Sequence, residues 1–223
     1  RASGCGRVAG DCKLSDNFWD LDLVAHALES CVTATAPRGD RLLGNVSTDT
    51  RSIRAGDIFV ALVGDRFDGH DFVAKAVDAG ARALVVSRDV DVSADDVAIF
   101  RVQDTLVALG SLARFRRVVW GGTLIAVAGS NGKTSTKDLL RAALESRLRV
   151  HATTGNLNNR IGVPLTLLSL PADADVAVIE LGTSIPGEIA TLRGIVLPDI
   201  AIVTSIAEEH LQGFGDIRGV LRE

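Results

Sequence analysis

Continuous apolar runs rich in β-branched residues alternate with helical patterns along this chain, and this alternation constrains the fold more than any other feature. Strands are predicted over 57–63, 82–87, 97–102, 124–129, 175–181 and 199–205. Helices are predicted over 71–81, 104–119 and 133–146, and from Pro186 onward. Strands that are apolar throughout and separated by helices belong to parallel sheets covered on both faces. The sequence therefore predicts an α/β protein.

Gly121 and Gly122 interrupt the alternation, so we place a domain boundary near residue 119. Residues 17–119 are predicted to form a small N-terminal α/β domain. Residues 120–223 are predicted to form a mostly parallel sheet flanked by helices. Residues 1–16 show no regular periodicity and are predicted to be a flexible leader.

The first helix is predicted from Phe18 onward, because Leu21, Val24 and Leu28 recur at helical spacing. Asp16 or Asn17 is the expected cap of this helix. Both tryptophans, Trp19 and Trp120, are expected in core or boundary packing.

Composition excludes several classes of function. The net charge is -4, so the chain has no overall positive field with which to hold nucleic acid or an anionic membrane. No apolar run approaches the roughly 18 to 20 residues of a membrane span, which predicts no membrane insertion. Three cysteines, all before residue 32, form no CxxC pair, and this usage favours a reducing, cytoplasmic location.

A glycine-rich turn, GSNGKT (129–134), directly follows a predicted strand and opens a predicted helix. Successive backbone N–H groups of such a turn can surround a phosphate at the positive end of the helix. Lys133 adds a positive charge, and Thr134 offers a hydroxyl to Mg²⁺. The general P-loop pattern has glycine where this chain has Val127, so the match is partial. The residues predicted to bind ATP are Gly129, Ser130, Asn131, Gly132, Lys133, Thr134 and Ser135.

The string IAVAGSNGKTST (125–136) closely resembles the ATP-binding loop of the Mur ligases, which also lacks the first P-loop glycine. Further similar strings follow in the family's order: GNLNNRIGVPLTLL (155–168), VIELGTSIPGEI (178–189) and TSIAEEHLQGFGDI (204–217). Upstream, residues 47–86 are similar to the uridine-nucleotide domain of the peptide-adding members. The resemblance extends over residues 18–223.

This resemblance implies an ATP-dependent amide ligase of peptidoglycan precursor synthesis that uses Mg²⁺. The GNLNN and PGEI strings are most similar to the member that adds D-alanyl-D-alanine to UDP-N-acetylmuramoyl-tripeptide. In that reaction the γ-phosphoryl group passes to a carboxylate, and an amine then attacks the acyl phosphate. The family also implies a cytoplasmic enzyme that is monomeric at full length.

Glu180 is predicted at the carboxyl end of a strand beside the glycine-rich turn, where open α/β sheets bind ligands. A carboxylate there can hold Mg²⁺, whereas a capping or solvated glutamate is the structural alternative. From the residues alone, a lone histidine such as His210 is as often a hydrogen-bonded structural residue as a metal ligand. The resemblance to the Mur ligases implies that His210 is a ligand of a second Mg²⁺. The predicted metal ligands are therefore Thr134, Glu180 and His210, and the predicted catalytic residues are Lys133, Glu180 and His210. Glu188 is expected to be a first-turn helix acid outside the site.

Two departures from the family pattern lie near His210. The relatives usually have Asn where this chain has Ser205, and a Gly-Pro-Ala-like stretch where it has residues 207–209.

Side chains for a nucleotide sugar are expected in two regions. Asn156, Asn158 and Asn159 lie in a glycine-bounded loop and offer amide groups to sugar hydroxyls or phosphate oxygens, the alternative being an asparagine-rich turn. In the N-terminal domain, Arg51 can contact a pyrophosphate. The alternative is that Arg51 and Asp49 form only a surface ion pair. The predicted substrate-binding residues are Asp49, Arg51, His70, Asn156, Asn158 and Asn159.

Three alternative functions remain open. A P-loop kinase or GTPase-like switch would have a Walker-B aspartate or a guanine-reading NKxD motif, and this chain has Glu180 and no NKxD string. A non-catalytic nucleotide-binding module would keep the loop without the chemistry. Within the family, the diaminopimelate- or lysine-adding ligase differs in its amine substrate.

The sequence is expected to be an N-terminal fragment without the family's C-terminal domain, and inactive alone. It has no methionine, and by resemblance the carbamylated lysine that supports the second metal lies just past Glu223.

Overall fold

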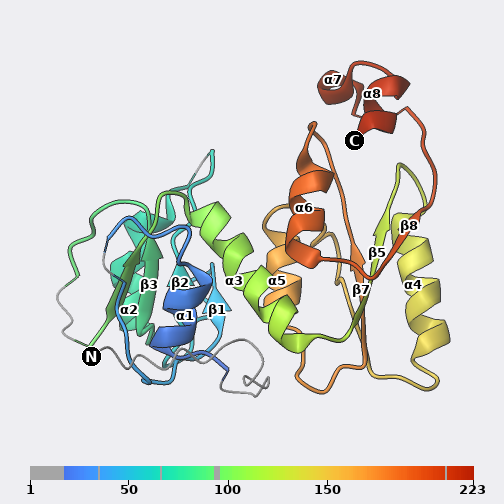
Figure 1. The fold of residues 1–223 in the computed structure, drawn as a ribbon. Coiled ribbons are helices and arrows are strands. Elements are labelled where there is room, and N and C mark those ends of the chain that lie inside the picture. Colours follow the sequence, from blue (N-terminus) through green and yellow to red (C-terminus); the bar gives the residue numbers. More distant parts are fainter. Residues whose placement is uncertain (1–17, 35, 66, 93–95, 209) are drawn as a thin grey trace, which may run out of the picture.

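The computed structural model describes residues 18–34, 36–65, 67–92, 96–208 and 210–223. Two four-stranded sheets lie side by side, every strand pairing in each is parallel, and helices cover them (Figure 1). The predicted α/β class is therefore confirmed. The leader predicted over 1–16 lies outside the described residues. No helix among the described residues is both long and apolar enough to cross a bilayer.

The first sheet has the strand order β1-β2-β3-β4. Its strands are Val46–Ser47, Ile58–Val60, Ala83–Val86 and Ala98–Arg101. On one face, Phe59 and Leu84 pack against helix α2 (Val73–Asp78), which follows a 3₁₀ turn at Gly69–Phe72. On the other face, buried residues such as Val85 join the core that includes α1 and α3. Burial on both faces explains why these strands are apolar throughout.

Helix α1 spans Leu21–Ala27 and is capped by Asp20, whose carboxylate accepts a hydrogen bond from the amide of Leu23 at 2.7 Å. The predicted caps, Asp16 and Asn17, lie outside the described residues, and the prediction that either caps this helix is wrong. Trp19 is 2% exposed and extends into the core before the helix begins, so the helix starts later than predicted.

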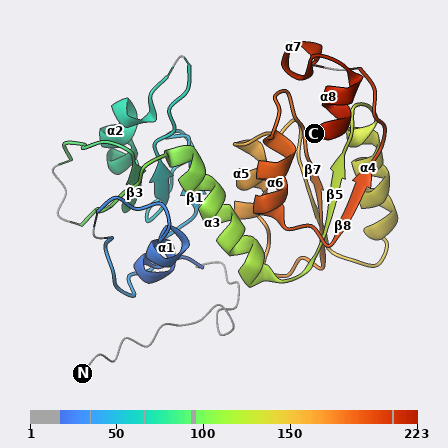
Figure 2. The ribbon, with the colours of Figure 1, turned by 45° about the horizontal axis from the view of Figure 1, so that its top comes forward.

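Helix α3 (Thr105–Trp120) lies between the two sheets (Figures 1 and 2). Asp104 caps its first turn, and Gly121 ends it in the left-handed conformation, with φ of 66°. Leu109 and Leu112 belong to one continuous core that contains residues of both sheets. The domain boundary near residue 119 stays a prediction. Helix α3 packs against both halves of the chain.

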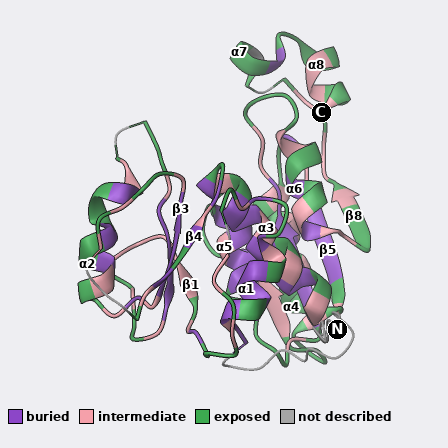
Figure 3. Cartoon of the chain, turned by 60° about the vertical axis from the view of Figure 1, so that its left-hand side comes forward, coloured by how far each residue is buried: buried purple, intermediate pink, exposed green. Residues whose placement is uncertain are grey.

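The second sheet has the strand order β6-β7-β5-β8. Its strands are β5 (Thr123–Ala128), β6 (Val150–Ala152), β7 (Val176–Glu180) and β8 (Ile200–Val203). Helix α4 (Lys133–Leu144) covers one face, and α5 (Gly162–Leu168) and α6 (Glu188–Val196) cover the other, as Figures 1 and 2 show. In Figure 3, β5 lies beside β8 and is purple, that is buried, over most of its length.

Five elements were not predicted: β1, β6, α5, α7 (Leu211–Phe214) and α8 (Ile217–Arg222). The strands β1 and β6 are two and three residues long and only half-buried, so they show no apolar run. Helix α5 contains Pro164 in its first turn, where proline is tolerated because that amide has no intrahelical partner.

Candidate functional site

The glycine-rich turn joins the carboxyl end of β5 to the start of α4. Gly129 and Gly132 have φ angles of 124° and 83°, which side chains other than hydrogen disfavour. A Cβ atom at Gly129 would also lie 2.9 Å from the carbonyl oxygen of Ser205, so the loop after β8 leaves room only for glycine. The predicted strand–turn–helix geometry is present.

Two of the amides predicted to surround a phosphate are already used. The Ser130 amide donates to the carbonyl of Ser205 at 2.9 Å, and the Asn131 amide donates to the Ser205 hydroxyl at 3.0 Å. Ser205, which stands where the relatives usually have Asn, thus ties the loop after β8 to the glycine-rich turn. In this conformation the amides of Ser130 and Asn131 are therefore engaged within the protein, and their predicted contact with ATP stays a prediction.

The start of α4 keeps its capacity to bind an anion. Its cap residue, Gly132, has no side chain to satisfy the first-turn amides, and those amides have no acceptor within the helix. Their partial positive charge adds to that of the helix dipole. In this conformation, the amides available to an anion are therefore those of the first turn of α4.

Lys133 points back into the turn. Its ammonium group donates to the carbonyls of Gly129 at 2.6 Å and Ser130 at 3.1 Å. These carbonyls hold the charge beside the first turn of α4, where a triphosphate would lie.

Thr134, Glu180 and Asn158 form one hydrogen-bonded cluster. Val127 of β5 is the partner of Glu180 in the parallel register, which confirms that Glu180 ends a strand beside the glycine-rich turn. Glu180 is 2% exposed. The Thr134 hydroxyl donates to its Oε2 at 2.9 Å, and the Asn158 amide group donates to its Oε1 at 2.8 Å.

A second layer behind Glu180 was not predicted. The backbone amide of Glu180 donates to the hydroxyl of Thr153 at 2.9 Å. The carbonyl of Thr153 accepts a bond from the ammonium group of Lys137 at 2.9 Å, and Lys137 is only 5% exposed. Lys137 lies four residues after Lys133, a spacing that places both lysines on one face of α4. This spacing was the sequence signal that could have identified Lys137 as part of the site.

The three predicted substrate-binding asparagines have different environments. Asn158 binds Glu180, as described. The carboxamide oxygen of Asn159 accepts bonds from the amides of Ile161 and Gly162, at 3.1 and 2.8 Å, and so caps the start of α5. Asn156 is exposed. Asn159 is exposed as well, although its carboxamide oxygen is used by the cap, and contact of these side chains with a nucleotide sugar stays a prediction.

Oxygen donors, which Mg²⁺ prefers, are present at Thr134 and Glu180, so these residues fit the ion. His210 is exposed in the loop between β8 and α7 and has a φ of 47°. Within the described ranges, no three or more His, Cys, Asp or Glu side chains gather around one point. The role of His210 as a metal ligand stays a prediction. Glu188 lies in the first turn of α6, as predicted, and accepts a bond from the Ser184 amide at 2.8 Å.

A hollow of about 580 Å³ opens at the carboxyl ends of β1 and β2. It is lined by Thr48, Asp49, Thr50, Arg51, Phe59, Leu62, Gly64, Phe67, Gly69, Phe72 and Lys75. Arg51 donates to Asp49 at 2.6 Å, and this bond lowers the pKa of the Asp49 carboxyl group to about 2. Asp49 and Arg51 therefore form an exposed ion pair at the edge of the hollow, with Lys75 as a further cation.

His70 lies beneath this hollow, with its side chain 1% exposed. The Ser87 amide donates to its Nε2 at 2.9 Å, so the other ring nitrogen, Nδ1, carries the proton and donates to Asp68 at 2.6 Å. Both nitrogens are occupied. The ring thus links the residues after β2 to the end of β3, and the predicted role of His70 in substrate binding stays a prediction.

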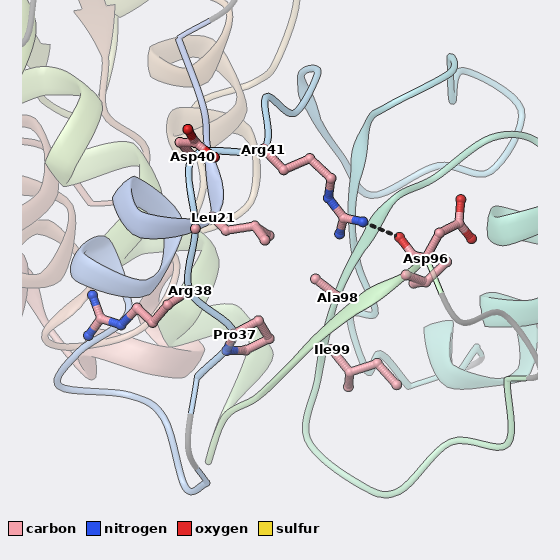
Figure 4. Close-up of a pocket in the computed structure, with 10 residues that line it drawn as sticks. Leu21, Pro37, Arg38, Asp40, Arg41, Asp96, Ala98 and Ile99 are labelled. Carbon is pink, nitrogen blue, oxygen red and sulfur yellow. Dashed lines mark hydrogen bonds between the residues drawn. The ribbon is translucent and has the colours of Figure 1, made fainter.

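A second, wide hollow lies beside Pro37, Arg41 and Ile99 (Figure 4). Arg41 donates to the backbone carbonyl of Asp96 at 2.6 Å across it. Ala98 is the first residue of β4, so this hollow lies toward the amino ends of the strands. Ligands of parallel sheets bind at the carboxyl ends, and we assign it no substrate.

Two family profiles match the chain. The profile described as the Mur ligase middle domain matches residues 127–223, and the one described as the Mur ligase family, catalytic domain, matches residues 43–117.

Among curated relatives, the UDP-N-acetylmuramoyl-tripeptide–D-alanyl-D-alanine ligase of Bacillus subtilis is 44% identical over 179 residues, which are 80% of this chain and 39% of the relative. The ligase of the same name from Escherichia coli is 45% identical over 183 residues, which are 82% of this chain and 40% of the relative. The chain thus spans about two fifths of the length of these relatives.

Solved structures agree. A crystal structure of MurF from Acinetobacter baumannii superimposes with a TM-score of 0.83 at 36% identity, over 92% of this chain and 44% of that one. MurF ligase from Thermotoga maritima, solved in complex with ADP, superimposes with a TM-score of 0.74 at 36% identity, over 80% of this chain and 41% of that one.

Proposed function

The chain belongs to the Mur ligase family, and from this premise we propose that it carries the ATP-binding and UDP-substrate-binding parts of a ligase that joins D-alanyl-D-alanine to UDP-N-acetylmuramoyl-tripeptide. The choice of substrates rests on the names of the relatives, and the site's geometry supports the chemistry. The observation that carries the proposal is the uncapped start of α4, with Lys133 at the turn and Thr134 bonded to Glu180.

The first half of the reaction needs two anions to meet. A carboxylate oxygen of the muramoyl peptide attacks the γ-phosphorus of ATP, the bond to the β,γ-bridging oxygen breaks, and an acyl phosphate and ADP result. This step gains mainly from positioning and charge neutralisation. The first-turn amides of α4 and Lys133 supply positive charge to the phosphates. Mg²⁺, when bound, would neutralise further phosphate charge, and Thr134 and Glu180 are the residues that would hold it, with His210 proposed as the ligand of a second ion.

In the second half, the amine of the dipeptide attacks the carbonyl carbon of the acyl phosphate. The carbon–oxygen bond to phosphate breaks, phosphate leaves with the electron pair, and the amine loses a proton as the amide forms. The acyl-phosphate route explains why one turn must bind a triphosphate beside a second, carboxylate-bearing substrate.

The hollow beside Arg51 is the proposed site of the uridine diphosphate group. Arg51 and Lys75 offer positive charge to its phosphates, and Phe67, which is 73% exposed, offers a ring on which a base can stack. Asn156, exposed in the loop before α5, is a proposed contact for the sugar. Helix α3 runs back from the end of β4 to the start of β5, so the carboxyl ends of both sheets lie on the same side of the molecule (Figures 1 and 2). One substrate can therefore extend from the hollow toward the glycine-rich turn.

Calorimetric titration of the chain with MgADP and, separately, with UDP-N-acetylmuramoyl-tripeptide tests this assignment. We expect both to bind. Lys133→Ala should abolish detectable MgADP binding and leave the UDP-substrate affinity unchanged, because the two sites are separate. Arg51→Ala should weaken only the UDP substrate.

Binding of MgADP without any binding of the UDP substrate would favour the alternative of a nucleotide-binding module. Retention of MgADP affinity in Lys133→Ala would contradict the proposed site. Phosphate release from ATP across a panel of amine acceptors, measured on the longest protein that the gene encodes, distinguishes D-alanyl-D-alanine from a diamino acid.

A further inference from the structure

The carboxylate of Glu180 is held from two sides. Its oxygens accept one bond each, from the Thr134 hydroxyl at 2.9 Å and the Asn158 amide group at 2.8 Å. Thr134 begins α4, whereas Asn158 belongs to the loop between β6 and α5. Two donors from separate elements fix a buried carboxylate in one orientation.

Asn158 is itself fixed by the backbone on both of its sides. Its carbonyl accepts a bond from the Gly182 amide at 2.8 Å, and its amide donates to the carbonyl of Asn156 at 2.8 Å. A Cβ atom at residue 182 would lie 2.9 Å from the Cγ atom of Asn158, so the carboxamide fits only because residue 182 is glycine. The loop and the end of β7 are thus shaped around this one side chain.

The two donors differ in what they can do when a cation is present. The lone pairs of the Thr134 oxygen can bind a cation directly, and the hydroxyl is a proposed ligand. The nitrogen of the Asn158 carboxamide is a donor only, so it cannot bind a cation and is left to hold Glu180. Hydrogen bonds to a metal-binding carboxylate orient it, and their loss typically lowers metal affinity about 10- to 100-fold.

We propose that Asn158 is a positioning residue, whose amide group holds the Glu180 carboxylate in the orientation that receives the divalent ion accompanying ATP. The proposal deepens the proposed function and rests on its assignment of a nucleotide and Mg²⁺ to this site. It replaces the sequence-based expectation that Asn158 contacts the nucleotide sugar.

The test compares ADP affinity in excess Mg²⁺ with ADP affinity in EDTA, by calorimetry. In Asn158→Ala, we expect affinity in Mg²⁺ to fall about 10- to 100-fold, and affinity in EDTA to stay unchanged, because the amides of α4 and Lys133 are intact. If the alanine variant folds poorly, Asn158→Leu replaces it, because leucine keeps the side-chain volume without the donor. We expect the same loss of affinity in Mg²⁺ and the same unchanged affinity in EDTA. Thr154→Ala is the matched control: it removes an exposed hydroxyl of the same loop and should change neither affinity.

An equal loss in both media would assign Asn158 a merely structural role and overturn the proposal, and so would an unchanged affinity in Mg²⁺. A crystal structure of Asn158→Ala without nucleotide gives a second readout that does not depend on ADP. We expect the Glu180 carboxylate to rotate or to adopt several conformers. If it keeps one unchanged orientation, the proposal is wrong. A wild-type chain that binds no ADP would instead count against the proposed function.

Discussion

At the scale of single residues, His151 makes the stability of the fold depend on pH. Its ring, on β6, is half-buried, and Nε2 donates to the carbonyl of Thr166 at 2.8 Å. Burial lowers the pKa of this imidazole below its usual value. An unfolded chain with an ordinary histidine therefore binds a proton at a pH where the folded chain does not, and acid favours unfolding.

We predict that the melting temperature of the chain falls as the pH drops below about 6.5, the ordinary pKa of histidine. His151→Gln keeps a donor for the Thr166 carbonyl but cannot titrate. Its melting temperature should therefore fall less between pH 7.5 and 5.5 than that of the wild-type chain. The check is thermal unfolding of both proteins at both pH values. Equal losses in the two proteins would show that His151 carries none of the dependence.

The sequence could identify Lys133, Thr134 and Glu180 because their roles follow from local order: a strand, a turn and a helix, or the end of a neighbouring strand. It could not distinguish Asn156, Asn158 and Asn159, which have the same side chain within four positions. Their roles depend on which one meets Glu180, 22 positions away from Asn158 in the chain. The same holds for His70, whose partner Ser87 is 17 positions away.

At the scale of elements, Arg117 near the end of α3 links this helix to the end of α6. Arg117 is 7% exposed and donates to the carbonyls of Val196 and Leu197, at 2.9 and 3.0 Å, and to the carboxylate of Asp199 at 2.8 Å. These carbonyls end α6, and cations are stabilising at helix C-termini. Leu197 has a φ of 46°, and this bond helps to hold it in that left-handed conformation.

Arg117→Met should lower the free energy of unfolding by about 2 kcal/mol, because it leaves the buried carbonyl of Val196 and the partly buried carbonyl of Leu197 without this donor. Arg147→Met is the control, since Arg147 is exposed and its change should cost less than about 0.5 kcal/mol. Urea denaturation of both variants measures the difference. A cost at Arg117 no larger than at Arg147 would show that the arginine does not hold α6 to α3.

Elements with a clear apolar run or helical period were predictable from the sequence, and elements without such a pattern were not. The end of α3 follows from Gly121, and β3, β5 and β7 follow from unbroken apolar runs. By contrast, β6 is stabilised by pairing with β7, and α5 by packing in the core that contains α3. Tertiary contacts of this kind leave no periodic signal in the sequence.

At the scale of the whole molecule, one core joins both sheets through α3, and both carboxyl edges face the same side (Figure 1). This arrangement gives the central claim its physical basis. The central claim is our proposal that the start of α4 binds the phosphates of ATP and that a second substrate reaches them from the hollow of the first sheet.

A crystal structure of the chain with Mg²⁺ and a non-hydrolysable ATP analogue tests this claim most directly. We predict phosphate oxygens within hydrogen-bond distance of the amides at the first turn of α4. Lys133 should turn from the carbonyls of Gly129 and Ser130 to the phosphates. Phosphates bound elsewhere, with Lys133 still on those carbonyls, would contradict the account.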